Sequence, residues 1–307
     1  MDNQDIKVTI RCITYNQKDY IRQCLDGFVM QRTNFRFEAI VHDDASTDGT
    51  DEIVREYAEK YPDIIKPIFE TENQYSKHDG SLGRIMNANT RGKYVAICEG
   101  DDYWTDPLKL QKQADFLDAN PQCSLTYHAC KNVFSTPCKV NSLTGENVNK
   151  LYSDVELVDY PFQTGTVMYR KSIVESDLYK RLVNIGCLFG DVLIYLTASR
   201  FGTIEGVNEQ MSVYRRHEGS VSQHMYDADK LWKSYNDWLK VALLFGGKIS
   251  SLIKKERLST FIVKAFSNKK YFLFLRLEAL SLIKSPISFV QSLKTILCFH
   301  FNRFFKK

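Results

Sequence analysis

Three carboxylates stand within four residues in the stretch Glu99-Gly100-Asp101-Asp102. They follow the apolar run Tyr94–Cys98, which predicts a buried strand. Carboxylates this close repel one another, and each raises the pKa of its neighbours unless a cation lies among them. Oxygen ligands suit Mg²⁺ or Mn²⁺, which keep several waters and bridge to substrate phosphates. The stretch therefore predicts a metal and phosphate site, with a solvated acidic turn as the alternative.

Two further polar clusters end apolar runs earlier in the chain. Thr14-Tyr15-Asn16 end the first of these runs, and Asp43-Asp44 end the second. Polar and aromatic side chains at the ends of strands could contact a ligand. The alternatives are a core aromatic for Tyr15 and turn formers for the polar residues around it.

The elements around these clusters alternate between strand and helix. This alternation predicts a parallel, doubly wound α/β sheet, which binds ligands at the carboxyl ends of its strands. All three clusters would then lie at one edge. The predicted strands are 7–13, 37–41, 64–69 and 94–98, and the predicted helices end near 30, 61 and 89.

The rest of the chain continues with mixed patterns. A polar, irregular segment interrupts it and predicts an insertion or a loop over the site. This segment is 135–159; the predicted strands are 123–134, 162–169, 203–207 and 210–214, the predicted helices are 107–119, 171–184 and 190–200, and the chain is helical from 228 onward.

Five pieces of the sequence resemble the family-two glycosyltransferases with a GT-A fold, a Rossmann-like sheet with flanking helices. They cover about residues 6–222 in the family's order. Ala45 stands where the family usually has Gly, Glu99 where an Asp is common, and Gly190 where an acid often precedes Asp191. The pieces are Ile13-Thr14-Tyr15-Asn16, His42 through Thr50, Glu99 through Asp102, Gly190-Asp191 and Tyr214-Arg215-Arg216-His217.

The resemblance implies a role for each matching residue. Asp191 would be the general base, with the cap of the following helix as a compatible reading. A Mn²⁺ or Mg²⁺ ion would be held by Asp101, Asp102 and His217. The implied nucleotide contacts are Thr14, Tyr15, Asn16, Asp43, Asp44, Arg84, Glu99 and Asp101, and the implied lining of the sugar or acceptor pocket is Tyr103, Trp104 and Arg216.

The implied reaction is an inverting, metal-dependent sugar transfer from a nucleotide-diphospho-sugar, UDP-linked in our expectation. The acceptor would be a hydroxyl of a glycan or lipid-linked glycan in cell-surface polysaccharide synthesis. One alternative is a non-catalytic nucleotide-sugar or glycan-binding protein. The other is a nucleotidyltransferase, which usually has a glycine-rich loop after its first strand. A dinucleotide oxidoreductase fits poorly, because no G-x-G-x-x-G motif follows that strand.

Charge divides the chain into an acidic body and a basic tail. Residues 248–307 hold thirteen Lys and Arg against two acids, whereas residues 1–247 hold 28 bases and 35 acids. We expect a catalytic domain over 1–225, with a nucleotide-sugar half to about 105 and an acceptor half over 106–225, and a helical basic region over 226–307. The segment 286–307 matches a helix at a membrane interface, or a helical cap on the domain. No nucleic-acid-binding module is present.

Cysteine spacing and the N-terminus bear on the compartment. The eight cysteines show no C-x-x-C pair, which argues against a zinc site. The start of the sequence is polar and acidic, unlike a secretion signal, and no run of 18 apolar residues occurs. We therefore expect a cytoplasmic protein, with peripheral contact to the inner face of the cytoplasmic membrane as a further expectation for the tail.

Overall fold

The computed structural model describes residues 5–134, 142–144, 152, 156–157, 162–217, 228–245 and 262. The chain divides into two compact units, Met1–His217 and Glu218–Lys307. The first unit contains all the candidate site residues named above. In the second unit, α9 (Ala228–Phe245) is the described helix, and the predicted interfacial segment 286–307 lies outside the described residues.

A nine-stranded mixed sheet forms the centre of the first unit. Its strand order is β3-β2-β1-β4-β8-β6-β9-β5, with β7 paired to β6. The pairs among β1 to β4 are parallel, and so is β6 with β9; β8, β5 and β7 pair antiparallel with their neighbours. The strands are β1 (Val8–Thr14), β2 (Phe37–Asp43), β3 (Ile65–Phe69), β4 (Tyr94–Ile97), β5 (Tyr103–Trp104), β6 (Cys123–Phe134), β7 (Ser142–Thr144), β8 (Met168–Arg170) and β9 (Thr203–Arg216).

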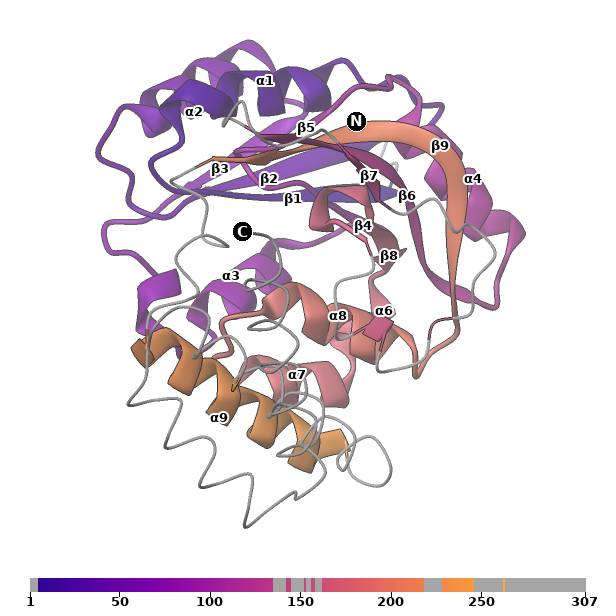
Figure 1. Cartoon of the computed structure of the whole chain (residues 1–307). Helices are drawn as coiled ribbons and strands as arrows, with labels where there is room; N and C mark the ends of the chain where they lie inside the picture. Colours follow the sequence, from indigo (N-terminus) through magenta and orange to yellow (C-terminus); the bar gives the residue numbers. More distant parts are fainter. Residues whose placement is uncertain are drawn as a thin grey trace, which may run out of the picture. The chain divides into compact units, whose positions relative to one another are not determined.

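Helices cover both faces of the parallel strands. In Figure 1, α1 and α2 lie over one face of the sheet, and α3 and α8 lie over the other. The prediction of an α/β fold with flanking helices is confirmed. The helices of this unit are α1 (Lys18–Val29), α2 (Thr50–Lys60), α3 (Ser81–Asn89), α4 (Lys109–Ala119), α6 (Ser172–Glu175), α7 (Asp177–Val183) and α8 (Gly190–Ala198), with two 3-10 turns, η1 (Tyr75–Lys77) and η2 (Thr164–Thr166).

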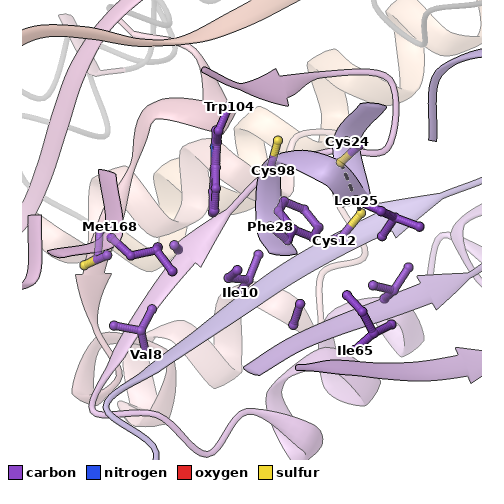
Figure 2. Close-up of a cluster of buried hydrophobic side chains, with 14 of the residues drawn as sticks. Val8, Ile10, Cys12, Cys24, Leu25, Phe28, Ile65, Cys98, Trp104 and Met168 are labelled. Carbon is purple, nitrogen blue, oxygen red and sulfur yellow. Dashed lines mark hydrogen bonds between the residues drawn. The ribbon is translucent and has the colours of Figure 1, made fainter. Parts of the chain in front are cut away.

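Strand β1 is buried on both faces, as is typical of a central parallel strand. Its residues Ile10 and Cys12 pack against Phe28 of α1 in the main hydrophobic cluster, which Trp104 also joins (Figure 2). On the opposite face, Arg11 is only 6% exposed. Its guanidinium donates to Asn87 Oδ1 (2.9 Å) and to the Tyr169 hydroxyl (3.2 Å), so this buried charge is hydrogen-bonded.

The predicted continuous strand over 162–169 is wrong. Residues Thr164–Thr166 form the turn η2, and β8 begins only at Met168. Trp104 Nε1 donates to the carbonyl of Gly165 and Gln113 Nε2 to that of Thr166, both over 2.9 Å. These side chains take the carbonyls that a neighbouring strand would otherwise have bonded, so the segment turns.

Two other predicted elements also differ from the structure. The helix predicted over 171–184 is broken at Ser176, which has extended backbone angles and whose hydroxyl accepts from the N–H of Tyr179 to cap α7. The two strands predicted over 203–207 and 210–214 are one strand, β9, whose register against β6 shifts near Ala129. Such a bulge places extra residues on one strand without ending the pairing.

No described helix is long and apolar enough to cross a membrane. The six cysteines among the described residues are free thiols, and five of them are buried, where a thiol packs as a small hydrophobic group.

Candidate active site

The acidic stretch after β4 folds against the end of β1. The N–H of Gly100 donates to the carbonyl of Ile13 over 3.0 Å. A Cβ atom at position 100 would lie 2.7 Å from Oγ1 and 2.8 Å from Cβ of Thr14, so glycine allows this close approach. The loops after β1 and β4 are therefore packed together at the carboxyl edge of the sheet.

The three carboxylates of this stretch meet in space. One oxygen from each of Glu99, Asp101 and Asp102 lies within 4.8 Å of the others. Burial, followed by the charges of Asp101 and Asp191, raises the pKa of Glu99 to about 8. Burial, followed by the charge of Asp101, raises the pKa of Asp102 well above its ordinary value. Both shifts arise because the site concentrates negative charge away from water, and a cation beside it would relieve them.

The end of β9 contacts this cluster from a distant part of the sequence. Nε2 of His217 lies 3.1 Å from Oδ2 of Asp101. The backbone N–H of Arg215 donates to Oδ1 of Asp102 over 2.8 Å, and its guanidinium donates to the main-chain carbonyl of Asp101 over 2.6 Å. The same guanidinium lies 4.3 Å from the ring centroid of Tyr103. The sequence did not single out Arg215 for a role, although it lies beside the two predicted residues Arg216 and His217.

These donors fit a divalent cation by their chemistry. Three carboxylates and one imidazole are ligands that Mn²⁺ accepts, and carboxylates with added water suit Mg²⁺. His217 was the predicted third ligand, and its pairing with Asp101 places the imidazole at the acidic cluster. Asp102 has one oxygen occupied by the Arg215 N–H, so its other oxygen is the one available to a metal.

A second pair of carboxylates lies at the end of β2. Asp44 accepts two backbone N–H groups, from Gln74 to Oδ1 (2.7 Å) and from Tyr75 to Oδ2 (3.0 Å). Asp43 accepts from the N–H of Ser46 with Oδ1 (2.9 Å), whereas its Oδ2 is buried and has no hydrogen-bond partner among the described residues. Burial also raises the pKa of Asp43. Asp44 thus ties the η1 segment to β2, and Asp43 keeps an oxygen free to accept.

The predicted nucleotide contacts at the end of β1 differ in what they do locally. The Thr14 hydroxyl donates to Oε1 of Gln17 over 2.9 Å. Asn16 has a φ of 50°, and its side chain accepts from the N–H of Thr47 over 2.8 Å. Both residues hold loops in shape. Tyr15 is 47% exposed, so its ring is available for stacking, unlike a core aromatic.

Asp48 connects two helices at this edge. Oδ2 of Asp48 accepts from the N–H of Lys18 at the start of α1, and Oδ1 accepts from the N–H of Thr50 at the start of α2, both over 3.0 Å. Asp48 thus accepts from the first N–H of α2, although the residue at the N-cap position of this helix is Gly49. A carboxylate near two helix starts is favoured by both helix dipoles.

Asp191 lies in the first turn of α8. The N-cap residue of this helix is Phe189, so Asp191 lies two positions inside the helix instead of at the predicted cap position. Its Oδ2 accepts from the hydroxyl of Thr164 (3.0 Å), and its Oδ1 accepts from the N–H of Val192 (2.9 Å). The charge of Asp191 contributes to the raised pKa of Glu99, so the structure brings the predicted base to the acidic cluster.

Three predicted residues are placed differently from the rest. Arg84 donates to the carbonyl of Asp79 and to Asn184, both outside the acidic cluster. Trp104 is 2% exposed and belongs to the hydrophobic core, so its side chain does not line a pocket. Arg216 lies over the ring of Phe134, 5.3 Å from its centroid. Tyr103 contacts the site through Arg215, whose guanidinium lies 4.3 Å from its ring centroid.

Comparison with known proteins relates these features to a family. The pattern described as glycosyl transferase family 2 matches residues 9–176. The Mycobacterium tuberculosis protein Rv1520 is 37% identical over 229 residues, which are 74% of this chain and 64% of that protein. TuaG of Bacillus subtilis, whose name assigns it provisionally to teichuronic acid biosynthesis as a glycosyltransferase, is 26% identical over 77% of this chain and 90% of its own length.

Solved structures show the same fold. Residues 1–349 of Staphylococcus aureus TarS, in complex with UDP-GlcNAc, match with a TM-score of 0.60 and 19% identity over 85% of this chain and 73% of that one. The mannosyltransferase PcManGT of Pyrobaculum calidifontis, in complex with GDP-Man and Mn²⁺, matches with a TM-score of 0.55 and 16% identity over 97% and 81%. These matches confirm the GT-A fold. Because the family pattern also covers more than half of the sequence, the chain belongs to glycosyl transferase family 2.

Proposed function

We propose that this protein transfers a sugar from a nucleotide-diphospho-sugar to an acceptor hydroxyl, with inversion at the anomeric carbon and with a divalent cation. One observation carries the proposal. The acidic cluster, its His217 contact and the carboxylate of Asp191 come from three separate segments and converge at the carboxyl edge of one sheet. Binding at that edge is the general behaviour of such sheets.

The nucleobase is the first group to be recognised. In our proposal, the exposed ring of Tyr15 stacks on it and the free Oδ2 of Asp43 accepts its imide N–H. Asp44, which the resemblance implied for the base, acts mainly by holding the η1 segment beside it. A buried acceptor without a partner discriminates strongly, because a base that lacks the N–H leaves it unpaired.

Asp101 and Asp102 would hold the cation, with His217 beside Asp101. Bound there, a divalent cation would supply positive charge that stabilises the departing nucleotide diphosphate. Arg215 fixes the loop that carries both carboxylates, through Asp102 Oδ1 and the carbonyl of Asp101. Glu99 lies within the cluster and interacts electrostatically with Asp191, so we assign it to the donor ribose or to a bound water.

Asp191 is the proposed general base. It takes the proton of the acceptor hydroxyl while that oxygen attacks the anomeric carbon opposite the leaving diphosphate, and this single displacement inverts the configuration. Its electrostatic interaction with Glu99 supports this role, because the base has to lie near the donor site that the acceptor oxygen attacks.

The donor and acceptor classes rest on relatives. TarS binds UDP-GlcNAc in its solved complex, which favours a UDP-linked donor here, while the GDP-Man complex of PcManGT makes a GDP-sugar the other outcome to test. The name of TuaG points to a surface polysaccharide, so we propose a glycan or lipid-linked glycan acceptor. We propose that the acceptor half of the domain is built around the paired strands β6 and β9. The predicted halves, 1–105 and 106–225, stay predictions.

The test is a donor screen that measures nucleotide release, with and without Mn²⁺ or Mg²⁺, in the presence of membrane and glycan fractions. We expect release from one class of nucleotide-sugar that requires the cation and falls at least a hundredfold in Asp191→Asn. Binding of UDP by calorimetry without release from any donor would instead favour a binding protein. Full activity of both Asp101→Asn and Asp191→Asn would refute the mechanism.

The basic tail is proposed to contact the inner face of the membrane through 286–307, where the acceptor would be found. The thirteen Lys and Arg of residues 248–307 support attraction of this tail to anionic lipid. Co-sedimentation with vesicles that contain or lack phosphatidylserine should distinguish a membrane contact from a helical cap on the domain. If a chain ending at 285 and a full-length variant with Arg303, Lys306 and Lys307 changed to Gln both sediment like wild type, the tail is a helical cap rather than a membrane contact.

A further inference from the structure

The hydroxyl of Thr164 donates a hydrogen bond to Oδ2 of Asp191 over 3.0 Å. We propose that Thr164 is a positioning residue for the proposed base, set by the η2 turn so that the carboxylate of Asp191 keeps one orientation toward the acceptor. This inference rests on the proposed function. The sequence assigned no role to Thr164, which lay inside a predicted strand.

The turn that carries Thr164 is held from outside the site. Trp104 of β5 donates to the carbonyl of Gly165, and Gln113 of α4 donates to the carbonyl of Thr166, each over 2.9 Å. The Thr166 hydroxyl donates to the carbonyl of Gln163 over 2.7 Å, and Thr166 is fully buried. Both neighbours of Thr164, Gln163 and Gly165, are thus restrained, so the position of Thr164 is set by contacts other than its bond to Asp191.

The carboxylate is restrained at both oxygens. Oδ1 of Asp191 accepts from the N–H of Val192, within the same helix, and Oδ2 accepts from Thr164, which lies 27 residues earlier in the chain. A carboxylate with one contact on its own backbone can still rotate about its terminal bond. The second contact, from a separate element, fixes that rotation.

The hydroxyl also favours the ionised form of Asp191, because a hydrogen bond to a carboxylate stabilises its charge. Among the described residues, the titratable groups that feel the charge of Asp191 include Glu99 at the end of β4, Tyr75 in η1, Tyr179 in α7 and Tyr195 in α8. Of these groups, Glu99 is a carboxylic acid, and its negative charge opposes the ionisation of Asp191. The hydrogen bond from the Thr164 hydroxyl offsets this effect.

The matched variants are Thr164→Val and Thr164→Ser. Valine keeps the shape and removes the hydroxyl, whereas serine keeps the hydroxyl and removes a methyl. For Thr164→Val we expect kcat to fall about tenfold, because the loss of one hydrogen bond to the base changes the rate by about this factor. The donor KM and the melting temperature should stay near wild type, and the acidic limb of kcat should move to higher pH. Thr164→Ser should retain most of kcat and the wild-type pH profile.

The outcomes separate this inference from the proposed function. If Asp191→Asn abolishes transfer while Thr164→Val keeps the wild-type kcat and pH profile, the base stands and the positioning role is wrong. Equal losses in Thr164→Val and Thr164→Ser would show that the methyl packing matters and would also overturn the inference. If Asp191→Asn transfers sugar at the wild-type rate, the base itself is wrong and the proposed function fails first.

Discussion

Nε2 of His217 lies 3.1 Å from Oδ2 of Asp101, although 116 positions separate the two residues in the chain. The imidazole is also packed on Tyr20 of α1, with 4.4 Å between the ring centroids. His217 is thus held in place from one side while its nitrogen faces the acidic cluster. This relationship joins the last residue of the first unit to the loop after β4.

The first prediction concerns this pair. His217→Gln should raise the Mn²⁺ concentration that gives half-maximal nucleotide release about 10- to 100-fold, because a ligand or its orienting partner is lost. The maximal rate at saturating Mn²⁺ should fall much less. Tyr20→Phe keeps the ring that packs on His217 and is the matched control. An unchanged Mn²⁺ dependence in His217→Gln would exclude His217 from the cation site.

A second prediction separates the two carboxylates of β2. Asp44→Asn places an amide N–H₂ against a backbone N–H of Gln74 or Tyr75, so the free energy of unfolding should fall by about 1–3 kcal/mol. Asp43→Asn can keep its bond to Ser46 and replaces an oxygen that has no partner among the described residues, so stability should change little.

The same variants differ in donor binding. Asp43→Asn should weaken UDP binding about tenfold or more, because the amide nitrogen cannot accept the imide N–H. Thermal melts and a calorimetric UDP titration on both variants give the comparison. Wild-type UDP affinity in Asp43→Asn would assign the base contact to another group.

A third prediction follows from the backbone of Ala45. Its φ is 66°, in the left-handed region that costs a non-glycine residue about 1–2 kcal/mol. The resemblance places Gly at this position, and the structure gives the physical reason. Ala45→Gly should raise the free energy of unfolding by about 0.5–1 kcal/mol after the added chain entropy is subtracted. Ala58→Gly, inside α2, is the control and should lower it. A loss of stability in Ala45→Gly would contradict the strain.

A fourth prediction uses Lys109 of α4, which is fully buried 3.8 Å from the ring centroid of Trp104. Its Nζ has no hydrogen-bond partner among the described residues. Burial lowers its pKa to about 7, whereas an unfolded lysine titrates near 10.4. Between these values the unfolded chain holds a proton that the folded chain lacks, so this group makes stability rise with pH.

Lys109→Met removes that cost. Near pH 6.5 the variant should be more stable than wild type by up to about 4 kcal/mol, and the gain should shrink as the pH approaches 10. Urea unfolding at pH 6.5, 8 and 9.5 measures the difference. Lys112→Met, on the same helix but paired with Asp106, should show no such gain. A pH-independent difference for Lys109→Met would mean that the ammonium is solvated.

Much of the nucleotide half could be predicted from the sequence because its signals are local. Apolar runs that end in Asp43 or Glu99 mark strand ends directly, and in a parallel sheet those ends share an edge. The second half of the sheet was harder, because β8 is short and antiparallel and β9 is bulged. Its pairing brings Arg215 to Asp102 across 113 positions, and no periodicity in either segment encodes that contact.

Individual side-chain roles were the least predictable part of the site. Thr14 and Asn16 read as ligand contacts by their position, yet their polar atoms hold neighbouring loops. Thr164 could have been noticed, since Gln163-Thr164-Gly165-Thr166 is a polar run inside an otherwise apolar predicted strand. Trp104 follows an acidic motif but is buried by α1, because packing rather than sequence position decides which face of an aromatic is covered.

Because Gly100 approaches Thr14 and Gln17 closely, the sequences of the loop after β1 and the loop after β4 have to be compatible with each other. The atoms that a larger side chain would strike belong to Thr14 and Gln17, which are hydrogen-bonded to each other, so a larger residue at position 100 requires the loop after β1 to adjust as well. A chimaera that takes the loop after β1 from one family member and the loop after β4 from another should lose folding or activity unless both come from the same parent. Recombination breakpoints that preserve function are therefore expected outside 14–100.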